Sequence, residues 1–528
     1  MADVRLLSYL AKVFPDELCQ GKTIDSADCL RGSRVSVQLA VKPDIDGVIA
    51  LDVRGCEHEI FRVDAVPVTR AAPDDRDDWY LRGAAPGLYP DLLIPSTAID
   101  GRAGEWASFW IDLVPEETCE VVFTVKTGSE TIEKTLAVRV TRAGLAKREL
   151  KCTHWFHGDC IADYYRLEVF SEAWWDRVGA FMRTAVQHGI NMLLTPVFTP
   201  PLDTEVGAER RTVQLVGVTA RDGRYAFDFT NFDRWARLAR ESGLEYLEIS
   251  HLFTQWGAKA APKVMATTEN GYERIFGWET KASDDAYTAF LEAFADAFIP
   301  HLETLGLADK VMFHASDEPG LSEFFAYKKA SETIRRLFGR FPVADALSEP
   351  MFLRTGLVRT PVVSVAAAGK FYGRTDDLWL YYCCGPGNGF MPNRFIAMPS
   401  QRNAILGFIL YRYGAKGFLH WGYNFYNTQL SRAQIDPFDV TDAGGCFPAG
   451  DAFVVYPGED GPLCSLRLKV FRQALDDCEA LRLLERDLGR DGVMKLLNEG
   501  LAHSLDERHY PRDEAWLLRK RQEIYSQI

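Results

Sequence analysis

Two adjacent carboxylates, Asp317 and Glu318, lie in the stretch "HASDEPG" over residues 314–320. They follow an apolar run, and Pro319 and Gly320 come directly after them. Neighbouring residues of a regular strand point to opposite faces, so both carboxyl groups can face one pocket only if the strand ends here. Close carboxyl groups repel each other as anions, which raises the pKa of one and makes it a general acid near neutral pH. Alternatively, one of them caps the helix predicted after Gly320.

A carboxyl pair with one raised pKa suits the cleavage of a glycosidic bond. One group protonates the leaving oxygen, and the other stabilises positive charge at the anomeric carbon. Sequence neighbours are awkwardly placed for a standard retaining pair, which flanks the scissile bond. Substrate assistance removes this difficulty, because a 2-acetamido group of the sugar attacks the anomeric carbon itself. Asp317 would then orient the amide nitrogen, and Glu318 would act first as acid and then as base.

Eight short apolar runs, with helical patterns between several of them, predict the scaffold that positions this pair. The runs cover residues 152–157, 190–198, 244–250, 310–316, 341–347, 361–367, 378–384 and 417–422. This rhythm is typical of a parallel sheet with crossover helices. The number of runs favours a (β/α)8 TIM barrel, an α/β fold, over an open doubly wound sheet, and no Gly-rich phosphate loop follows a strand.

The regions on either side of the barrel have different patterns. Residues 32–142 contain short alternating segments broken by Gly, Pro and Asp, which predict an antiparallel β-sandwich. We expect it to have an accessory role, either packing on a neighbouring domain or holding a homo-oligomer together. The predicted domains are a sandwich at 1–148, a catalytic barrel at 149–460 and a helical segment packed on the barrel at 461–528.

The carboxyl ends of the barrel strands should carry the chemistry, so the residues there are candidates for binding substrate. Aromatic rings can lie against the C–H face of a sugar, and polar groups can hold its hydroxyls. Trp155 and Tyr381 lie at strand ends, although such rings also fill cores. The predicted substrate-binding residues are His157, Asp159, His251, Trp256, Tyr382, Trp421, Tyr423 and Asn424.

No metal or other cofactor is predicted. His154, His157 and His251 come from two strands and lack a carboxylate-supported ligand set. The adjacent Cys383 and Cys384 lack the rest of a zinc spacing, and buried structural thiols are the better interpretation.

Composition and net charge indicate which classes of binding partner the protein can have. The 528 residues are 47% hydrophobic and 25% charged, with a formal net charge of -14, which argues against nucleic-acid binding through phosphates. No stretch approaches the ~20 apolar residues of a membrane span, and the N-terminal stretch lacks a signal-peptide pattern. Eleven cysteines fit reduced thiols in a cytosol. We therefore expect a cytoplasmic protein whose partner is a small oligosaccharide or glycoside.

Three segments resemble glycoside hydrolase family 123, the β-N-acetylgalactosaminidases. They are "FHASDEPG", "LYYCCGPGNGFMPNRFIAMPSQRNAILGFILYRYGAKGFLHWGYNFYN" and "DGPLCSLRLKVFRQALDDCEALRLL", and the resemblance covers roughly residues 150–485. It implies a β-sandwich followed by a (β/α)8 barrel and substrate-assisted catalysis by an adjacent Asp-Glu pair. Asp317 would polarise the acetamido group and Glu318 would be the acid/base. The chain departs from the family pattern at "GFLHWGYN", where "GFLYWGVN" is expected.

Two other functions fit the residues. A glycosidase for another sugar could use Glu318 as acid and a distant carboxylate such as Asp159 as nucleophile or base. A non-catalytic carbohydrate-binding or scaffolding protein could keep the same barrel.

Overall fold

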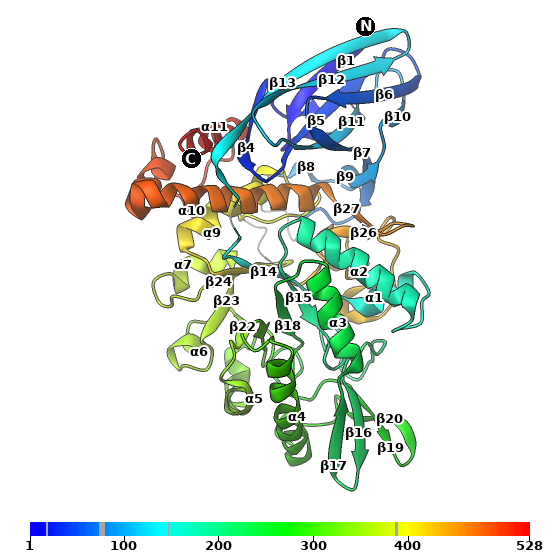
Figure 1. Cartoon of the computed structure of the whole chain (residues 1–528), viewed down its shortest axis with the longest axis vertical. Coiled ribbons are helices and arrows are strands. Elements are labelled where there is room, and N and C mark those ends of the chain that lie inside the picture. The colour runs from blue at the N-terminus through cyan, green and yellow to red at the C-terminus, as the bar shows by residue number, and fades with distance from the viewer. Residues whose placement is uncertain (17–18, 73–79, 146, 386–388) are drawn as a thin grey trace.

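The computed structural model describes residues 1–16, 19–72, 80–145, 147–385 and 389–528. The molecule is elongated, with a β-sandwich at one end, a barrel in the middle and a small additional sheet at the other end (Figure 1).

The N-terminal region folds as two five-stranded sheets packed face to face. The first has the order β1 (Asp3–Ser8), β5 (Val35–Lys42), β11 (Ala107–Val114), β7 (Glu57–Val68) and β9 (Gly87–Pro95). The second has the order β10 (Ala98–Gly101), β6 (Gly47–Arg54), β12 (Cys119–Thr127), β13 (Glu130–Gly144) and β4 (Ser26–Arg31). Alternate side chains of both sheets form the core between them, as period-two patterning predicts. The predicted sandwich is confirmed, although β13 and β4 pair in parallel.

Eight parallel strands form the barrel; six lie within the predicted runs, and β14 and β23 each begin one residue before theirs. Their spatial order is β21 (Val311–Met312), β18 (Tyr246–Ile249), β15 (Met192–Thr195), β14 (Lys151–His154), β25 (Gly417–His420), β24 (Trp379–Tyr382), β23 (Thr360–Ser364) and β22 (Ala344–Leu347). A single parallel bridge between Phe313 and Val343 links the two end strands, so the barrel is nearly closed. The predicted barrel is confirmed.

Helices cover the outside of the barrel between successive strands (Figure 1). They are α1 (Gly158–Tyr164), α2 (Glu172–Gln187), α3 (Thr230–Glu241), α4 (Asp285–Thr304), α5 (Phe324–Phe338), α6 (Met351–Arg354), α7 (Ala368–Phe371), α8 (Gln401–Ala404) and α9 (Leu406–Tyr413). In α2, Trp174, Val178, Phe181 and Ala185 recur at a spacing of three or four and are buried, which fixes its face toward the barrel. The helices α6 and α7 of two crossovers are only four residues long each.

The long helix α10 (Leu466–Asn498) lies between the barrel and the sandwich (Figure 1). Lys469 Nζ is 2.6 Å from Asp112 Oδ2 in β11, and Arg467 Nε is 2.9 Å from Asp91 Oδ1 in β9. Both ion pairs are buried, so the helix joins the two regions through charges that water does not screen. The last helix, α11 (Glu514–Tyr525), packs on β4 of the sandwich.

A four-stranded sheet was not predicted from the sequence. It consists of β17 (Arg224–Asp228), β16 (Gly217–Arg221), β19 (Val264–Thr268) and β20 (Gly271–Phe276), which are inserted on either side of α3 and β18. No helix of the described residues is long and apolar enough to cross a membrane. The predicted domain boundaries stay predictions.

Candidate active site

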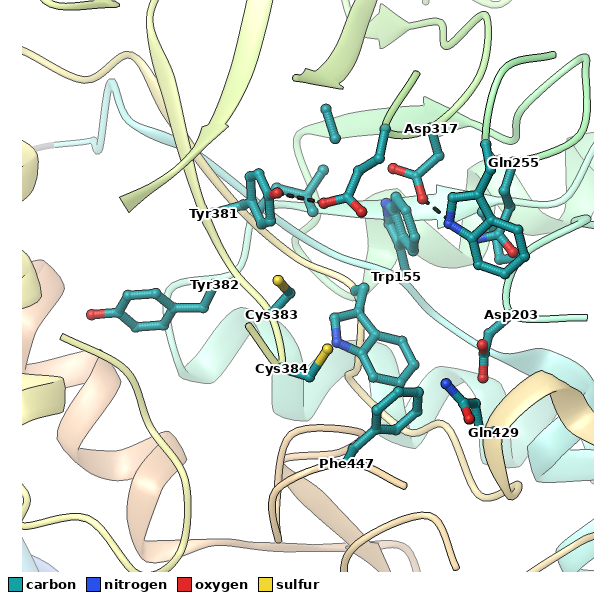
Figure 2. Close-up of a pocket in the computed structure, with 16 residues that line it drawn as sticks. Trp155, Asp203, Gln255, Asp317, Tyr381, Tyr382, Cys383, Cys384, Gln429 and Phe447 are labelled. Atoms are coloured by element: carbon teal, nitrogen blue, oxygen red, sulfur yellow. Dashed lines mark hydrogen bonds between the residues drawn. The ribbon is translucent and has the colours of Figure 1, made fainter. Parts of the chain in front are cut away.

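Asp317 and Glu318 lie in the loop that follows β21, at the carboxyl end of the barrel (Figure 2). Glu318 has a φ of 41°, in the left-handed region that residues with a Cβ seldom adopt. This turn in the backbone lets both neighbouring carboxyl groups reach one cavity. Glu323 occupies the N-cap position of α5, so neither Asp317 nor Glu318 caps that helix.

The cavity beside this pair has a volume of about 200 Å³ (Figure 2). Its aromatic wall consists of Trp155, Trp256, Tyr381, Trp421 and Phe447, and its polar lining includes Asp203, Gln255, Asp317, Glu318 and Gln429. Trp256 and Asp203 also have positive φ, of 55° and 39°. Backbone strain of this kind is held in place only by a well-packed surrounding, and it concentrates at functional sites.

The Asp317 carboxyl group is buried, with 7% of the residue exposed. Burial, and then the neighbouring charge of Glu318, raise the pKa of Asp317 to about 8. Gln255 Nε2 donates a hydrogen bond of 3.3 Å to Asp317 Oδ2 and partly offsets this rise. The pair therefore holds one proton at neutral pH, which is the state that acid catalysis requires.

Glu318 is partly exposed to the cavity and receives a hydrogen bond from the Tyr381 hydroxyl (Figure 2). Tyr381 belongs to β24, on the interior face of the barrel. A fixed donor at one carboxylate oxygen sets the orientation of the Glu318 side chain.

A buried charge network supports the loop that carries the pair. His314 Nε2 is 2.6 Å from Glu248 Oε1, and His314 Nδ1 is 3.5 Å from Asp345 Oδ1. Burial opposes a charge on this ring, but Asp345 and Glu248 together raise the pKa of His314 to about 10. His314 is thus an imidazolium at neutral pH, held between two carboxylates beneath the cavity.

The same two carboxylates hold the surrounding backbone and side chains. Asp345 Oδ1 accepts hydrogen bonds of 3.0 and 3.1 Å from the backbone N–H groups of Ala315 and Ser316. Glu248 Oε1 accepts a hydrogen bond of 2.8 Å from the indole N–H of Trp155, which lines the cavity. The network therefore fixes both the loop that carries Asp317 and Glu318 and one aromatic wall of the cavity.

Two further carboxyl groups lie at or near the cavity. Burial raises the pKa of Asp203 to about 6, and its Oδ2 accepts a 3.0 Å hydrogen bond from the backbone N–H of Leu430. Asp451 is buried behind Trp421, and the indole N–H of Trp421 donates a hydrogen bond of 2.9 Å to Asp451 Oδ2. Asp451 thereby fixes the plane of the Trp421 ring.

The structure brings some of the predicted binding residues to the cavity. Trp256 and Trp421 line it, and Tyr382 lies at its edge with its ring directed away (Figure 2). Period-two alternation along β24 explains why Tyr381 and not Tyr382 points its hydroxyl at Glu318.

The other predicted binding residues are engaged inside the protein and do not line this cavity. The His157 and Asp159 side chains both contact Arg210; Arg210 Nη2 lies 3.0 Å from His157 Nδ1, and its Nε donates 2.7 Å to Asp159 Oδ2. The His251 ring stacks on His314, with ring centroids 4.4 Å apart. The Tyr423 hydroxyl donates to the Phe181 carbonyl, and the Asn424 side chain bonds to the His157 backbone.

Several cavity residues were missed by sequence reasoning. Asp203, Gln255, Gln429 and Phe447 come from long loops, where no periodic pattern marks a residue as facing a cavity. Cys383 and Cys384 were interpreted as buried structural thiols in a strand. The structure places both beyond the end of β24, half-buried, on the cavity wall. Among the described residues, no group of three His, Cys, Asp or Glu is arranged to hold a metal ion.

Comparison with known proteins assigns the family. The family model "Glycoside hydrolase 123, catalytic domain" matches residues 155–484. The chain belongs to glycoside hydrolase family 123. It is therefore a glycosidase by family, as the sequence resemblance implied. No curated protein sequence matches it.

One solved structure agrees with this family 123 chain in fold. A family 123 glycoside hydrolase from Clostridium perfringens, described for glycolipid glycan hydrolysis, superposes with a TM-score of 0.74 at 13% identity, covering 99% of this chain and 97% of that one. A Clostridium thermocellum xylanase has a TM-score of 0.34 at 8% identity, covering 90% of this chain and 94% of that one. The first match extends over the sandwich as well as the barrel.

Proposed function

We propose that this family 123 enzyme is an exo-acting, retaining β-N-acetylhexosaminidase that releases N-acetylgalactosamine by substrate-assisted catalysis. The observation that carries the proposal is the pair Asp317 and Glu318, which face one cavity, where burial and the charge of Glu318 raise the pKa of Asp317 to about 8. A second carboxylate placed across the scissile bond is not needed when the substrate supplies its own nucleophile.

The proposed reaction follows from the positions of the two groups. Glu318 donates its proton to the leaving oxygen while the acetamido oxygen attacks the anomeric carbon and forms an oxazolinium ion. Asp317 accepts a hydrogen bond from the acetamido N–H, and this contact favours its charged form, so the shared proton moves to Glu318 when substrate binds. Glu318 then removes a proton from the water that opens the oxazolinium ion, and the anomeric configuration is retained.

The cavity supports attack at the end of a sugar chain. Trp155 and Tyr381 close its floor, and about 200 Å³ suits one sugar ring better than a run of several. Trp421 and Trp256 offer flat apolar faces to the C–H surfaces of that ring. The substrate is accordingly a small oligosaccharide or glycoside. All eleven cysteines are free thiols, which supports the proposed cytoplasmic location.

A two-carboxylate glycosidase is the second candidate, and one observation changes its form. Asp159 is held in a buried bidentate ion pair with Arg210, whereas Asp203 lines the same cavity as Glu318. This candidate would therefore use Asp203 as the second carboxylate. It predicts cleavage of sugars that lack a 2-acetamido group.

The purified enzyme should be assayed on a matched pair of aryl β-glycosides, the N-acetylgalactosaminide and the galactoside. We expect cleavage of the N-acetylgalactosaminide alone, with inhibition by a thiazoline that mimics the bound oxazoline. Cleavage of the galactoside without thiazoline inhibition would favour the candidate that uses Asp203. Binding of the sugar without turnover would indicate a non-catalytic carbohydrate-binding protein.

A further inference from the structure

Two polar side chains that the proposed reaction does not use lie at one end of the catalytic cavity. Asp203 and Gln429 both line the cavity, on the side away from Asp317 and Tyr381 (Figure 2). Asp203 lies in the loop after β15, and Gln429 begins the short 3-10 helix η3 (Gln429–Ser431) after β25. A sugar bound in the cavity would therefore have the catalytic pair at one end and these two side chains at the other.

One oxygen of the Asp203 carboxyl group has no partner in the described part of the chain. Its Oδ2 accepts the 3.0 Å hydrogen bond from the backbone N–H of Leu430, whereas no described residue donates to Oδ1. Only 8% of the residue is exposed, and Arg210, whose charge acts on Asp203, is held in its own ion pair with Asp159. The Gln429 amide also lacks a hydrogen-bond partner among the described residues. Such buried polar groups are costly unless a ligand satisfies them.

The backbone of two loops holds Asp203 in this place. Asp203 has a φ of 39°, and the residues that meet it, Leu430 and Ser431, have φ of 60° and 54°. Ser431 Oγ donates a 2.7 Å hydrogen bond to the Asp203 carbonyl oxygen, in addition to the Leu430 contact with the side chain. Strained backbone on both sides of this contact persists only when its surroundings fix it, and such strain concentrates at functional sites.

The side chains that line the cavity carry charge of one sign. They include three carboxyl groups, those of Asp203, Asp317 and Glu318, and no lysine, arginine or histidine among the described residues. Burial raises the pKa of Asp203 to about 6, although the Leu430 N–H and the charge of Arg210 oppose the rise, so this carboxyl group is an anion above that pH. An anionic group on a ligand would meet this charge without a counter-ion, in a site that screens charge less than water does.

We propose that Asp203, with Gln429, determines specificity: it accepts hydrogen bonds from the hydroxyl groups at C4 and C6 of the sugar and excludes sugars that carry sulfate or phosphate there. This inference rests on the proposed function, which places the acetamido group at Asp317 and the leaving oxygen at Glu318. In a pyranose ring C4 lies opposite C1, and C5, which bears the C6 hydroxymethyl group, lies opposite C2. The end of the ring away from the catalytic pair therefore presents these two hydroxyl groups.

The proposal narrows the class of substrate. A hydroxyl group can donate to Asp203 Oδ1 and accept from the Gln429 amide, which satisfies both unpartnered groups. A sulfate or phosphate ester has lost the hydroxyl hydrogen and brings a negative charge, so the site loses a donor and gains a repulsion. The substrate is accordingly a terminal sugar with both hydroxyl groups unmodified. A hydrolase that removes sulfate or phosphate must act first on any substrate that carries one.

The test uses aryl β-N-acetylgalactosaminides that differ only at C4 or C6: the unmodified, 4-deoxy, 6-deoxy, 4-O-sulfo and 6-O-sulfo sugars. We expect the wild-type kcat/KM to be about 100-fold or more lower on the sulfated sugars than on the unmodified one. Asp203→Asn keeps the size of the side chain and can still accept from Leu430, but it removes the charge.

This variant should lower kcat/KM on the unmodified sugar by roughly 10- to 100-fold, because a hydrogen bond to a charged group is lost. Its discrimination against the sulfated sugars should narrow by about tenfold or more, because the repulsion is gone. The loss of rate should disappear with the deoxy sugar that lacks the hydroxyl group held by Asp203.

Glu205→Gln is the matched control. Glu205 is a carboxylate two residues from Asp203, but it is solvent-exposed, pairs with Arg432 at 2.7 Å and is not among the residues that line the cavity. This variant should keep the wild-type kcat/KM on all five sugars. Melting temperatures of both variants control for folding.

Unchanged discrimination in Asp203→Asn, or a wild type that cleaves sulfated and unmodified sugars equally well, would overturn the proposal. A loss of about 10⁴ in kcat on every sugar, the deoxy sugars included, would also overturn it, because that result is expected of a second catalytic carboxylate.

A failure of the proposed function gives a different result, which is no cleavage of the unmodified sugar. Calorimetric binding of N-acetylgalactosamine and of its 4- and 6-sulfates then tests Asp203 without any reaction. A wild-type preference for the unsulfated sugar that Asp203→Asn loses would support the proposal. Equal affinity for the three sugars, or binding of none, would overturn it.

Discussion

Two buried carboxyl groups of the barrel, those of Asp159 and Asp317, differ in the charges that surround them. Asp159, at the start of α1, is 5% exposed and meets Arg210 through two hydrogen bonds of 2.7 and 2.8 Å. Asp317, after β21, is 7% exposed and has a second carboxyl group as its neighbour. Among the described residues, no ion pair joins Asp317 or Glu318 to a lysine or arginine.

These surroundings indicate which carboxyl group has a structural role and which can take part in a reaction. A buried carboxylate with its own guanidinium is electrostatically satisfied and has no reason to exchange a proton. A buried carboxyl pair without a lysine or arginine partner keeps a proton that it can donate, at a cost in stability. Sequence alone placed Asp159 among the candidates for substrate binding, and the Arg210 contact, 51 residues along the chain, is what gives it a structural role.

The largest expected effect is on turnover when the proton donor is removed. Glu318→Gln keeps the shape of the side chain but cannot protonate the leaving oxygen. We expect kcat/KM to fall by roughly 10²–10⁴, the usual contribution of a general acid. The measurement is the steady-state rate on an aryl β-N-acetylgalactosaminide, with the melting temperature as the control for folding. A rate within a few-fold of the wild type would remove Glu318 from the proposed reaction.

Removing the counter-charge of Asp159 should affect the stability of the fold instead of turnover. Arg210→Met leaves Asp159 buried without its counter-charge, and we expect a loss of about 3–5 kcal/mol in the free energy of unfolding, measured with urea. The matched control is Arg211→Met. Its ion pair with Asp163 is solvent-exposed, with side chains 39% and 36% accessible, so its loss should cost about 0–1 kcal/mol. Equal losses of unfolding free energy in the two variants would contradict the claim that Asp159 depends on its buried counter-charge.

A smaller, pH-dependent effect on folding stability is expected from the Asp317 carboxyl group. The pKa of Asp317 is about 8 in the folded protein and about 3.9 in an unfolded chain. Between these values the unfolded chain releases a proton that the folded protein keeps, so Asp317 reduces stability progressively as pH rises from 4 to 8. Asp317→Asn removes this penalty.

We therefore expect Asp317→Asn to match the wild type in stability near pH 4 and to exceed it by about 1–3 kcal/mol near pH 8. Urea unfolding at both values measures the difference. A constant difference across the range, or a variant that is less stable at the higher pH, would show that the Asp317 carboxyl is not held protonated.

Much of the fold could be predicted because burial imposes repeating patterns. The eight barrel strands are short, mostly apolar and buried on both faces, as strands covered by helices on one side and packed inside on the other must be. The inserted sheet was missed, although its hairpins carry local signals. Asp222 and Gly223 have φ of 48° and 69°, typical of the tight turn that joins β16 to β17. Glu269 and Asn270 join β19 to β20, and Gly271 follows them with a φ of 112°.

The candidate site was less predictable than the fold. Asp317 and Glu318 were found because their local sequence fixes both their chemistry and the end of the strand. Trp421 and Trp256 were found because they follow strands at the carboxyl end of the barrel. Asp203 and Gln429 lie in loops whose approach to the cavity is set by contacts such as that of Leu430 with Asp203, which no local pattern encodes.

The central claim is that the substrate's own acetamido group is the nucleophile, which a series of aryl β-glycosides tests directly. Its members would carry N-acetyl, N-fluoroacetyl, N-difluoroacetyl and N-trifluoroacetyl groups on the same sugar. Each fluorine weakens the carbonyl oxygen as a nucleophile and changes the size of the group little. The account predicts that kcat/KM falls steeply and steadily along the series, and a rate that is indifferent to fluorination would contradict it.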